Sequence, residues 1–241
     1  FTDRYKFAAD DTYPSSEKLY DWELGYQYTA PRLSLGVNLY YMKYKDQLVP
    51  TGMVNDDSNA LNTNVPDSYR RGVELSASWR ATGWFTVGAN ATFSQNRIEN
   101  YVDALKDSPT YGKELGDMTI AYSPDVIANA FLNFHHRGFE AVFHTQHVGK
   151  QYFTNNENDA LSLDAYCVTN LNLAYTFCTR SARSVRLGLL INNLFNAEYE
   201  SNGYGYSYMD TWSGPAPVRI DEAYYFPQAP LNVLANVTVK F

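Results

Sequence analysis

The sequence has few of the residue types from which catalytic and metal sites are built. It contains two cysteines and four histidines among 241 residues. Cys167 and Cys178 would lie roughly 36 Å apart on one extended strand at ~3.3 Å per residue, so we expect no disulfide between them. His144 and His147 are three residues apart and would point to opposite faces of a strand. With no glycine-rich phosphate loop or nucleophile–base set visible, we expect no catalytic residue, no cofactor and no metal site.

An excess of basic residues is also missing. Lysine and arginine number 19 against 26 acidic residues, for a net charge of −7. A nucleic-acid partner would need a basic surface to neutralise phosphates, so we do not expect one. Two acidic pairs, Asp10–Asp11 and Asp56–Asp57, fall in expected loops. Calcium binds in such loops, but solvated acidic residues are the commoner explanation.

No apolar run approaches the ~18 residues that a membrane-spanning helix needs. This excludes a helical membrane protein but not a barrel, whose strands place only every second residue on lipid. The chain starts at Phe1 with no leader-like segment, so the start is interpreted as a processed or truncated end.

Tyrosine and a period of two dominate what is present. There are 21 tyrosines, which suit the lipid–water boundary of a membrane barrel. In the last segment, alternate residues from Leu231 to Phe241 are apolar, and Leu234 is the one exception among the polar residues between them. This alternation predicts a strand with one apolar and one polar face. The same pattern predicts about nine strands, over residues 18–29, 32–47, 68–81, 84–100, 125–136, 138–152, 166–178, 184–196 and 229–241.

The expected connections alternate in length. The short links are Thr29–Arg32, Arg80–Gly83, His135–Gly138 and Cys178–Ser184. The long links are Asp46–Asp67, Tyr101–Pro124, Gln151–Ala165 and Asn196–Pro230. Short turns at one end and long loops at the other are typical of an outer-membrane barrel, whose turns lie in the periplasm.

Wide aromatic residues stand at the ends of the apolar faces, as in the two aromatic girdles of such a barrel. They include Tyr20, Tyr28, Tyr41, Trp79, Trp84, Tyr175 and Phe241. The sequence therefore predicts an all-β protein, an antiparallel transmembrane β-barrel.

Several motifs resemble the TonB-dependent outer-membrane transporters, especially those of Bacteroides-type bacteria. The segment Asn192–Asn196, followed by Tyr199, resembles the family motif before the last long loop. The ending Ala235–Phe241 resembles the last strand of the family, with its terminal phenylalanine. Three upstream segments also match family segments in their usual order: Glu17–Tyr28, Asn38–Val49 and Asn64–Leu75.

The resemblance implies a barrel of 22 strands with a plugged lumen. Residues 1–241 would then be the C-terminal portion, with the earlier strands, the plug and the TonB-binding segment upstream of Phe1. It implies an outer-membrane importer of a scarce nutrient, such as siderophore-bound iron, haem, cobalamin or a glycan. The implied partners are the lipid bilayer, the TonB energy-coupling protein through the N-terminal region, and a surface lipoprotein. A passive outer-membrane pore or structural barrel and a soluble all-β carbohydrate-binding module remain as alternatives.

Two sets of residues are candidates for function. Tyr204, Tyr206 and Tyr208 alternate with glycine and serine in the last long loop, and Trp212 follows them; such a stretch makes an adaptable aromatic surface for a ligand. The alternative is a rigid lid that continues the barrel. Phe241 is expected to mark the last strand for the barrel assembly machinery, since an unpaired strand edge in lipid is costly. The alternative for Phe241 is a girdle aromatic only.

Overall fold

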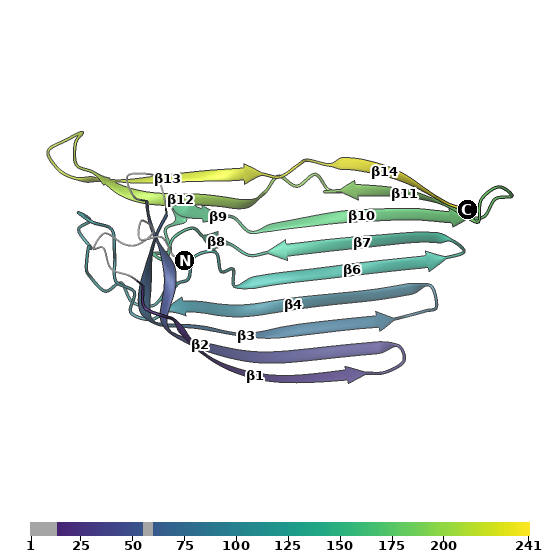
Figure 1. Ribbon diagram of the computed structural model, residues 1–241, viewed down its shortest axis with the longest axis horizontal. Helices are drawn as coiled ribbons and strands as arrows, with labels where there is room; N and C mark the ends of the chain where they lie inside the picture. Colours follow the sequence, from purple (N-terminus) through teal and green to yellow (C-terminus); the bar gives the residue numbers. More distant parts are fainter. Residues whose placement is uncertain (1–13, 55–59) are drawn as a thin grey trace.

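The computed structural model describes residues 14–54 and 60–241. Nine long antiparallel strands follow one another through a single sheet, and only β5 (Met118–Thr119) lies off this path, paired with β4. Figure 1 shows the strands side by side, with the short turns at one end and the long connections at the other. The nine strands are β1 (Lys18–Thr29), β2 (Leu33–Val54), β3 (Ala60–Arg80), β4 (Phe85–Ile98), β6 (Val126–His136), β7 (Phe139–Val148), β10 (Tyr166–Phe177), β11 (Ser184–Asn192) and β14 (Asn232–Lys240).

The alternating sequence pattern gives this sheet two chemically different faces. The register places Leu24 opposite Leu39, Leu39 opposite Val73, and Val73 opposite Phe93. Because side chains alternate along each strand, this register gathers the apolar residues on one face, here called the apolar face. Their neighbours in sequence, such as Asn38, form the polar face. The nine predicted strands are confirmed, and β1 has the predicted bounds.

The predicted loop Asp46–Asp67 is wrong, because β2 and β3 both continue through most of it. Asp46 adopts a positive φ of 54° and has no partner in the register, which resumes with Gln47 opposite Val65. The register is not shifted there, because Asp46 and Pro66 are skipped together; it shifts only between Pro50 and Val54, and an irregularity of that kind bends the strands. The two strands therefore run on beyond the alternating pattern. The acidic pairs Asp10–Asp11 and Asp56–Asp57 lie outside the described residues.

A second hairpin occupies the last long link, which was predicted to be a loop. It consists of β12 (Glu200–Asp210) and β13 (Val218–Pro227), paired with each other and not with the main sheet. The link between β7 and β10 folds into β8 (Gln151–Tyr152), the 3-10 helix η2 (Asp159–Leu161) and β9 (Ser162–Leu163). Figure 1 places both elements at the end of the long connections.

The motif Asn192–Asn196 forms the bend between β11 and this hairpin. The buried side chain of Asn193 accepts a hydrogen bond from the Ala197 amide and donates one to the Ala197 carbonyl, both at 2.8 Å. Asn193 and Asn196 adopt positive φ values of 51° and 53°, which asparagine tolerates better than most residues. The side-chain oxygen of Asn196 accepts a hydrogen bond from the Leu231 amide at 2.9 Å, which fixes the start of β14.

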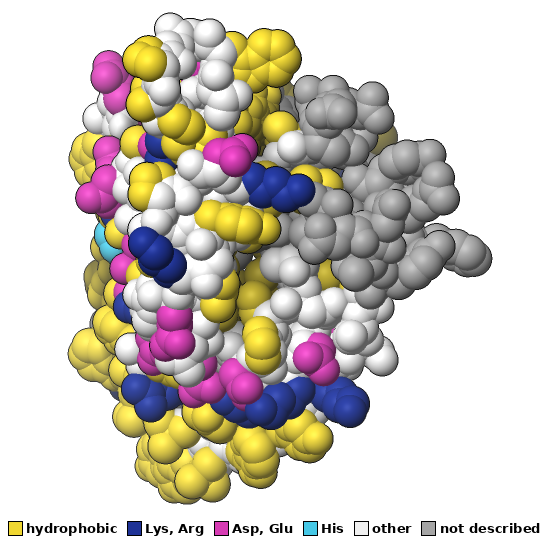
Figure 2. Space-filling model, turned by 90° about the vertical axis from the view of Figure 1, so that its left-hand side faces the viewer, with side chains coloured by type: hydrophobic (Ala, Val, Ile, Leu, Met, Phe, Trp, Pro, Cys, Tyr) yellow, Lys and Arg dark blue, Asp and Glu magenta, His cyan; other side chains and the backbone are white. Residues whose placement is uncertain are grey.

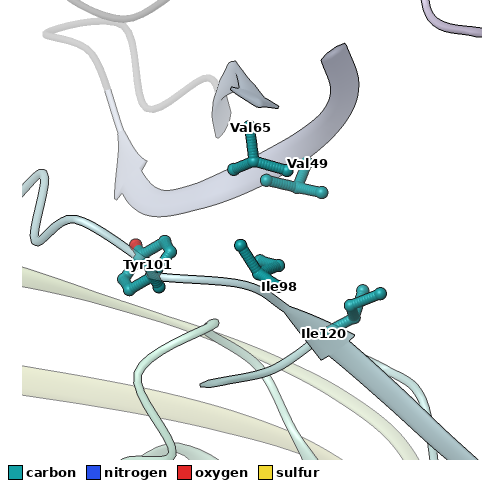
Figure 3. Close-up of a cluster of buried hydrophobic side chains, with 5 residues drawn as sticks. All are labelled: Val49, Val65, Ile98, Tyr101 and Ile120. Atoms are coloured by element: carbon teal, nitrogen blue, oxygen red, sulfur yellow. The ribbon is translucent and has the colours of Figure 1, made fainter. Parts of the chain in front are cut away.

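Two clusters of buried hydrophobic residues lie at the long-connection end. One joins Val49, Val65, Ile98, Tyr101 and Ile120 (Figure 3). The other consists of Phe153, Leu161 and Leu163. The long connections are thus a packed layer, here called the loop layer. Among the residues that the structure describes, no helix is long and apolar enough to cross a bilayer.

Candidate functional site

The polar face of the sheet carries a hydrogen-bonded network. Asn38 donates to Glu74 at 3.2 Å and to Glu23 at 3.4 Å, which links three strands. Near the short turns, Arg186 forms an ion pair with Glu140 at 2.6 Å. These groups satisfy one another while remaining accessible to water, so this face suits an aqueous interior.

The apolar face has an aromatic group at each end. At the long-connection end, the rings of Tyr20, Trp22 and Tyr41 follow one another at centroid distances of 6.4 and 5.7 Å. At the short-turn end, Trp84 and Phe85 contact Phe134 at 6.0 and 4.6 Å. Exposed leucine and valine residues lie between the two groups. Two aromatic girdles around an apolar band are what a membrane barrel presents to lipid.

Three of the four predicted ligand residues lie on one face of the β12–β13 hairpin. Tyr204 stacks on Tyr224 at 4.9 Å, and Tyr206 follows at 6.4 Å from the same ring. The hydroxyls of Tyr206, Tyr208 and Tyr224 all donate to the carboxylate of Glu222, at 2.7, 3.2 and 2.8 Å. We call these five residues the tyrosine cluster. Trp212 is not part of the cluster. It lies in the connection between β12 and β13 and is 91% exposed.

The hydrogen bonds fix the charge state of this cluster. The hydroxyls of Tyr206 and Tyr224 lower the pKa of Glu222. In return, the Glu222 carboxylate raises the pKa of Tyr206. At neutral pH the cluster therefore holds one carboxylate amid protonated phenols, with partly exposed aromatic rings around it.

On the other face of the hairpin, β12 contributes almost no side chains where it meets the loop layer. A Cβ at Gly203 would lie 2.7 Å from the Phe153 ring, and one at Gly205 would lie 2.9 Å from both Phe153 and Leu161. Glycine is needed at both positions because backbone and ring approach so closely. The alternation of tyrosine with glycine and serine in β12 thus gives one aromatic face and one flat packing face.

Residues 153–157 connect the separate parts of the loop layer, and no pattern in the sequence indicated a role for them. Asn155, which is 0% exposed, accepts the Ala121 amide at 2.7 Å and donates to the Pro50 carbonyl at 2.6 Å. Phe153 contacts both Tyr122 and Tyr225, each at 5.8 Å. We call residues 153–157 the connecting segment.

Glu157 ties this segment to β4 and β5. Burial opposes its ionisation, but hydrogen bonds from Thr119 and the charge of Arg97 outweigh this effect, and the pKa of Glu157 is lowered. The carboxylate forms an ion pair with Arg97 and accepts the Thr119 amide at 3.0 Å. A signal that could have found this segment is its run of Thr, Asn and Glu beside a lone phenylalanine, which is typical of a loop held by side-chain hydrogen bonds.

The remaining candidates are not brought together. Phe241 follows the end of β14 and is 93% exposed. Cys167 and Cys178 are both free and exposed at opposite ends of β10. Within residues 14–54 and 60–241, no three His, Cys, Asp or Glu side chains are placed to hold a metal ion.

Protonation of Glu222 should loosen the hairpin. Because the pKa of Glu222 is lowered in the folded state, its contribution to stability is present above the ordinary glutamate range and is lost as the pH falls through the folded value. We expect amide hydrogen exchange in β12 and β13 to accelerate below about pH 4 in the native protein. In Glu222→Gln this acid-induced change should vanish. Glu198→Gln, outside the cluster, should retain it, and an identical acid response in both variants would contradict the assignment.

The fold and its two faces define the class of protein: part of the wall of a transmembrane β-barrel, with a polar interior and an ordered loop layer. The family model of the TonB-dependent receptor-like β-barrel matches residues 5–194. The chain belongs to this family, whose members are bacterial outer-membrane proteins. The polar face therefore lines the lumen, and the apolar face meets lipid. The alternative of a soluble carbohydrate-binding module is wrong.

Individual relatives are distant. The pesticin receptor of Yersinia enterocolitica is 23% identical over 190 residues, which cover 78% of this chain and 26% of the receptor. The ferric yersiniabactin uptake receptor of Yersinia pestis has a TM-score of 0.64 at 20% identity, covering 93% of this chain and 30% of that one. The copper transporter OprC has a TM-score of 0.66 at 20% identity, covering 100% and 35%. The chain spans about a quarter of the length of the curated relatives it matches, and at these identities the solved structures support the fold alone.

Proposed function

We propose that the chain forms part of the wall and outer loops of an importer that uses energy to bring a scarce nutrient across the outer membrane. The observation that carries this proposal is the match of the TonB-dependent receptor model to residues 5–194. The polar lumen face and the packed loop layer above it are consistent with a solute path through the barrel. We propose no catalytic role for the chain.

For the substrate we favour a metal chelate of the siderophore type. Two similar structures are named for ferric yersiniabactin uptake and for copper transport. In this chain the tyrosine cluster adds aromatic rings beside a carboxylate, and such rings stack on planar groups of a ligand. Haem, cobalamin and glycans are the other candidates.

Three partners belong to this proposal. The TonB energy-coupling protein would act through the N-terminal region of the whole protein. The barrel assembly machinery would pair with β14 and read Phe241. A surface lipoprotein could cover the loop layer.

The experiment follows uptake of radioactive iron bound to a siderophore by cells that make the full-length protein. We expect saturable uptake that disappears when the TonB protein is deleted. Uptake that persists without TonB, together with free passage of small solutes, would support the alternative of a passive pore.

A matched pair of variants tests the tyrosine cluster in the same assay. Tyr204→Ala combined with Tyr208→Ala should weaken chelate binding by about tenfold, because each aromatic contact contributes ~0.5–1.5 kcal/mol. Tyr26→Ala combined with Tyr28→Ala removes two tyrosines from the apolar face of β1 and should leave binding unchanged. Equal effects of the two pairs would leave the tyrosines without a ligand role.

A further inference from the structure

Five basic residues gather on the apolar face of β1–β4, just where its apolar band ends toward the loop layer. The strand register sorts this area into rows. Counted toward the band, the rows are Lys18–Lys45–Asp67, then Tyr20–Lys43–Tyr69–Arg97, then Trp22–Tyr41–Arg71–Gln95, and finally the apolar row Leu24–Leu39–Val73–Phe93. We call Lys18, Lys43, Lys45, Arg71 and Arg97 the basic belt.

The charges of the belt are not balanced among the described residues. Lys43 forms ion pairs with Asp67 and Glu99, Lys45 with Asp67, and Arg97 with Glu157. Three carboxylates thus face five cations, in a chain whose net charge is −7. A local positive surface on an acidic chain indicates that an anion binds there.

Two members of the belt stand out because the described residues give them no carboxylate. Lys18 is directly opposite Lys45 in the β1–β2 register, an arrangement of like charges that is unfavourable unless an anion lies between them. Arg71 donates to the Gln95 side-chain oxygen at 2.9 and 2.6 Å, and its guanidinium lies 5.1 Å from the centre of the Tyr69 ring. These contacts hold the guanidinium in place while leaving its charge uncompensated.

The belt lies at the height of lipid headgroups. Its cations alternate with the aromatic residues at the long-connection end, where Tyr41 stacks on Tyr69 at 6.2 Å. Aromatic girdles mark the boundary between acyl chains and headgroups. Figure 2, seen from the long-connection end, shows Lys and Arg side chains in a row in its lower part, where β1 and β2 lie, next to exposed hydrophobic side chains.

We propose that the basic belt binds the phosphate groups of an anionic lipid of the outer leaflet, whose acyl chains lie on the apolar row from Leu24 to Phe93. A free phosphate ion would use the cations alone, whereas a lipid uses both the cations and the apolar surface directly below them. The inference rests on the outer-membrane location of the family and not on the proposed import. It therefore stands or falls independently of any uptake measurement.

The experiment measures lipid binding to the full-length protein, purified in detergent, by native mass spectrometry. The probes are bisphosphorylated lipid A, the same lipid without its phosphates, and inorganic phosphate. In the triple variant Lys18→Gln, Lys45→Gln, Arg71→Gln, we expect affinity for bisphosphorylated lipid A to fall on the order of 100-fold, from about 1 kcal/mol per basic residue near an anionic lipid surface. The dephosphorylated lipid should bind the native protein as weakly as lipid A binds the triple variant.

A control variant removes the same charge at the other end of the sheet, by Arg80→Gln, Arg180→Gln and Arg183→Gln. It should bind lipid A like the native protein. Equal loss in both triple variants, equal binding of the dephosphorylated lipid, or full competition by inorganic phosphate would each overturn the proposal. A heat-dependent shift in gel mobility, typical of intact barrels, verifies that every variant is folded before binding is compared.

Discussion

An arginine in place of Ala89 is expected to destabilise the barrel by about 2–4 kcal/mol, the cost of this charge near the bilayer midplane. Ala89 lies on the apolar face in the middle of β4, opposite Ala77 on one side and Ala130 on the other. No polar partner is available there, and the small neighbours give the guanidinium little help in reaching the headgroups. Equilibrium unfolding of the full-length protein in phospholipid vesicles measures the difference.

Asn90→Arg is the matched control, one residue further along the same strand. Asn90 faces the lumen, between Ser76 and Asn129, and accepts a hydrogen bond from Asn129 at 3.2 Å. Its replacement should cost only that bond, ~0.5–1.5 kcal/mol, because an arginine can extend into water. Similar costs at the two positions would contradict the assignment of the two faces.

The second large effect is expected in the loop layer. Phe153→Ala should weaken the packing of this layer by about 3–5 kcal/mol, since the ring is 1% exposed and its removal leaves a cavity against Gly203 and Gly205. Because the barrel strands do not depend on this contact, the loss should be local. Hydrogen exchange should accelerate in β12 and β13 and remain unchanged in β3 and β4.

The control for this experiment is Phe195→Ala. Phe195 is 74% exposed, so the same substitution should change the exchange of the hairpin by less than about 0.5 kcal/mol. If Phe153→Ala also leaves the hairpin protected, then Phe153 does not hold the layer together. A global loss of the barrel in Phe153→Ala would equally contradict a local role.

The sequence predicted the membrane part of the fold because lipid imposes a simple rule there. Residues 20–28 alternate strictly, with an aromatic or leucine side chain at every second position, and β1 has the predicted bounds 18–29. The rule fails where the strands leave the lipid. Beyond Asp46, β2 contains Pro50 and Gly52, and both of its faces contact protein or water. No alternation remains there to distinguish a strand from a loop.

The candidate site was predicted only in part, for a related reason. The tyrosines of β12 could be assigned to one surface because their spacing is local. Glu222, on which three hydroxyls converge, belongs to the other strand of the hairpin, and its role requires the register of β12 with β13. The partners of Asn155 lie 34 and 105 residues away in sequence, beyond the reach of any periodic pattern.

Asn155 and its two distant partners also constrain how this protein can diverge. Outer loops that make no contacts with one another can each gain or lose residues without affecting the others. Here one side chain joins the outer part of β2 to the link between β5 and β6, and Phe153, two residues before it, packs against a third part of the layer. An insertion beside Pro50 would displace the carbonyl that Asn155 needs, and so would disturb Ala121 and the hairpin as well. We therefore expect that, across relatives that keep this layer, the lengths of these connections change together or not at all.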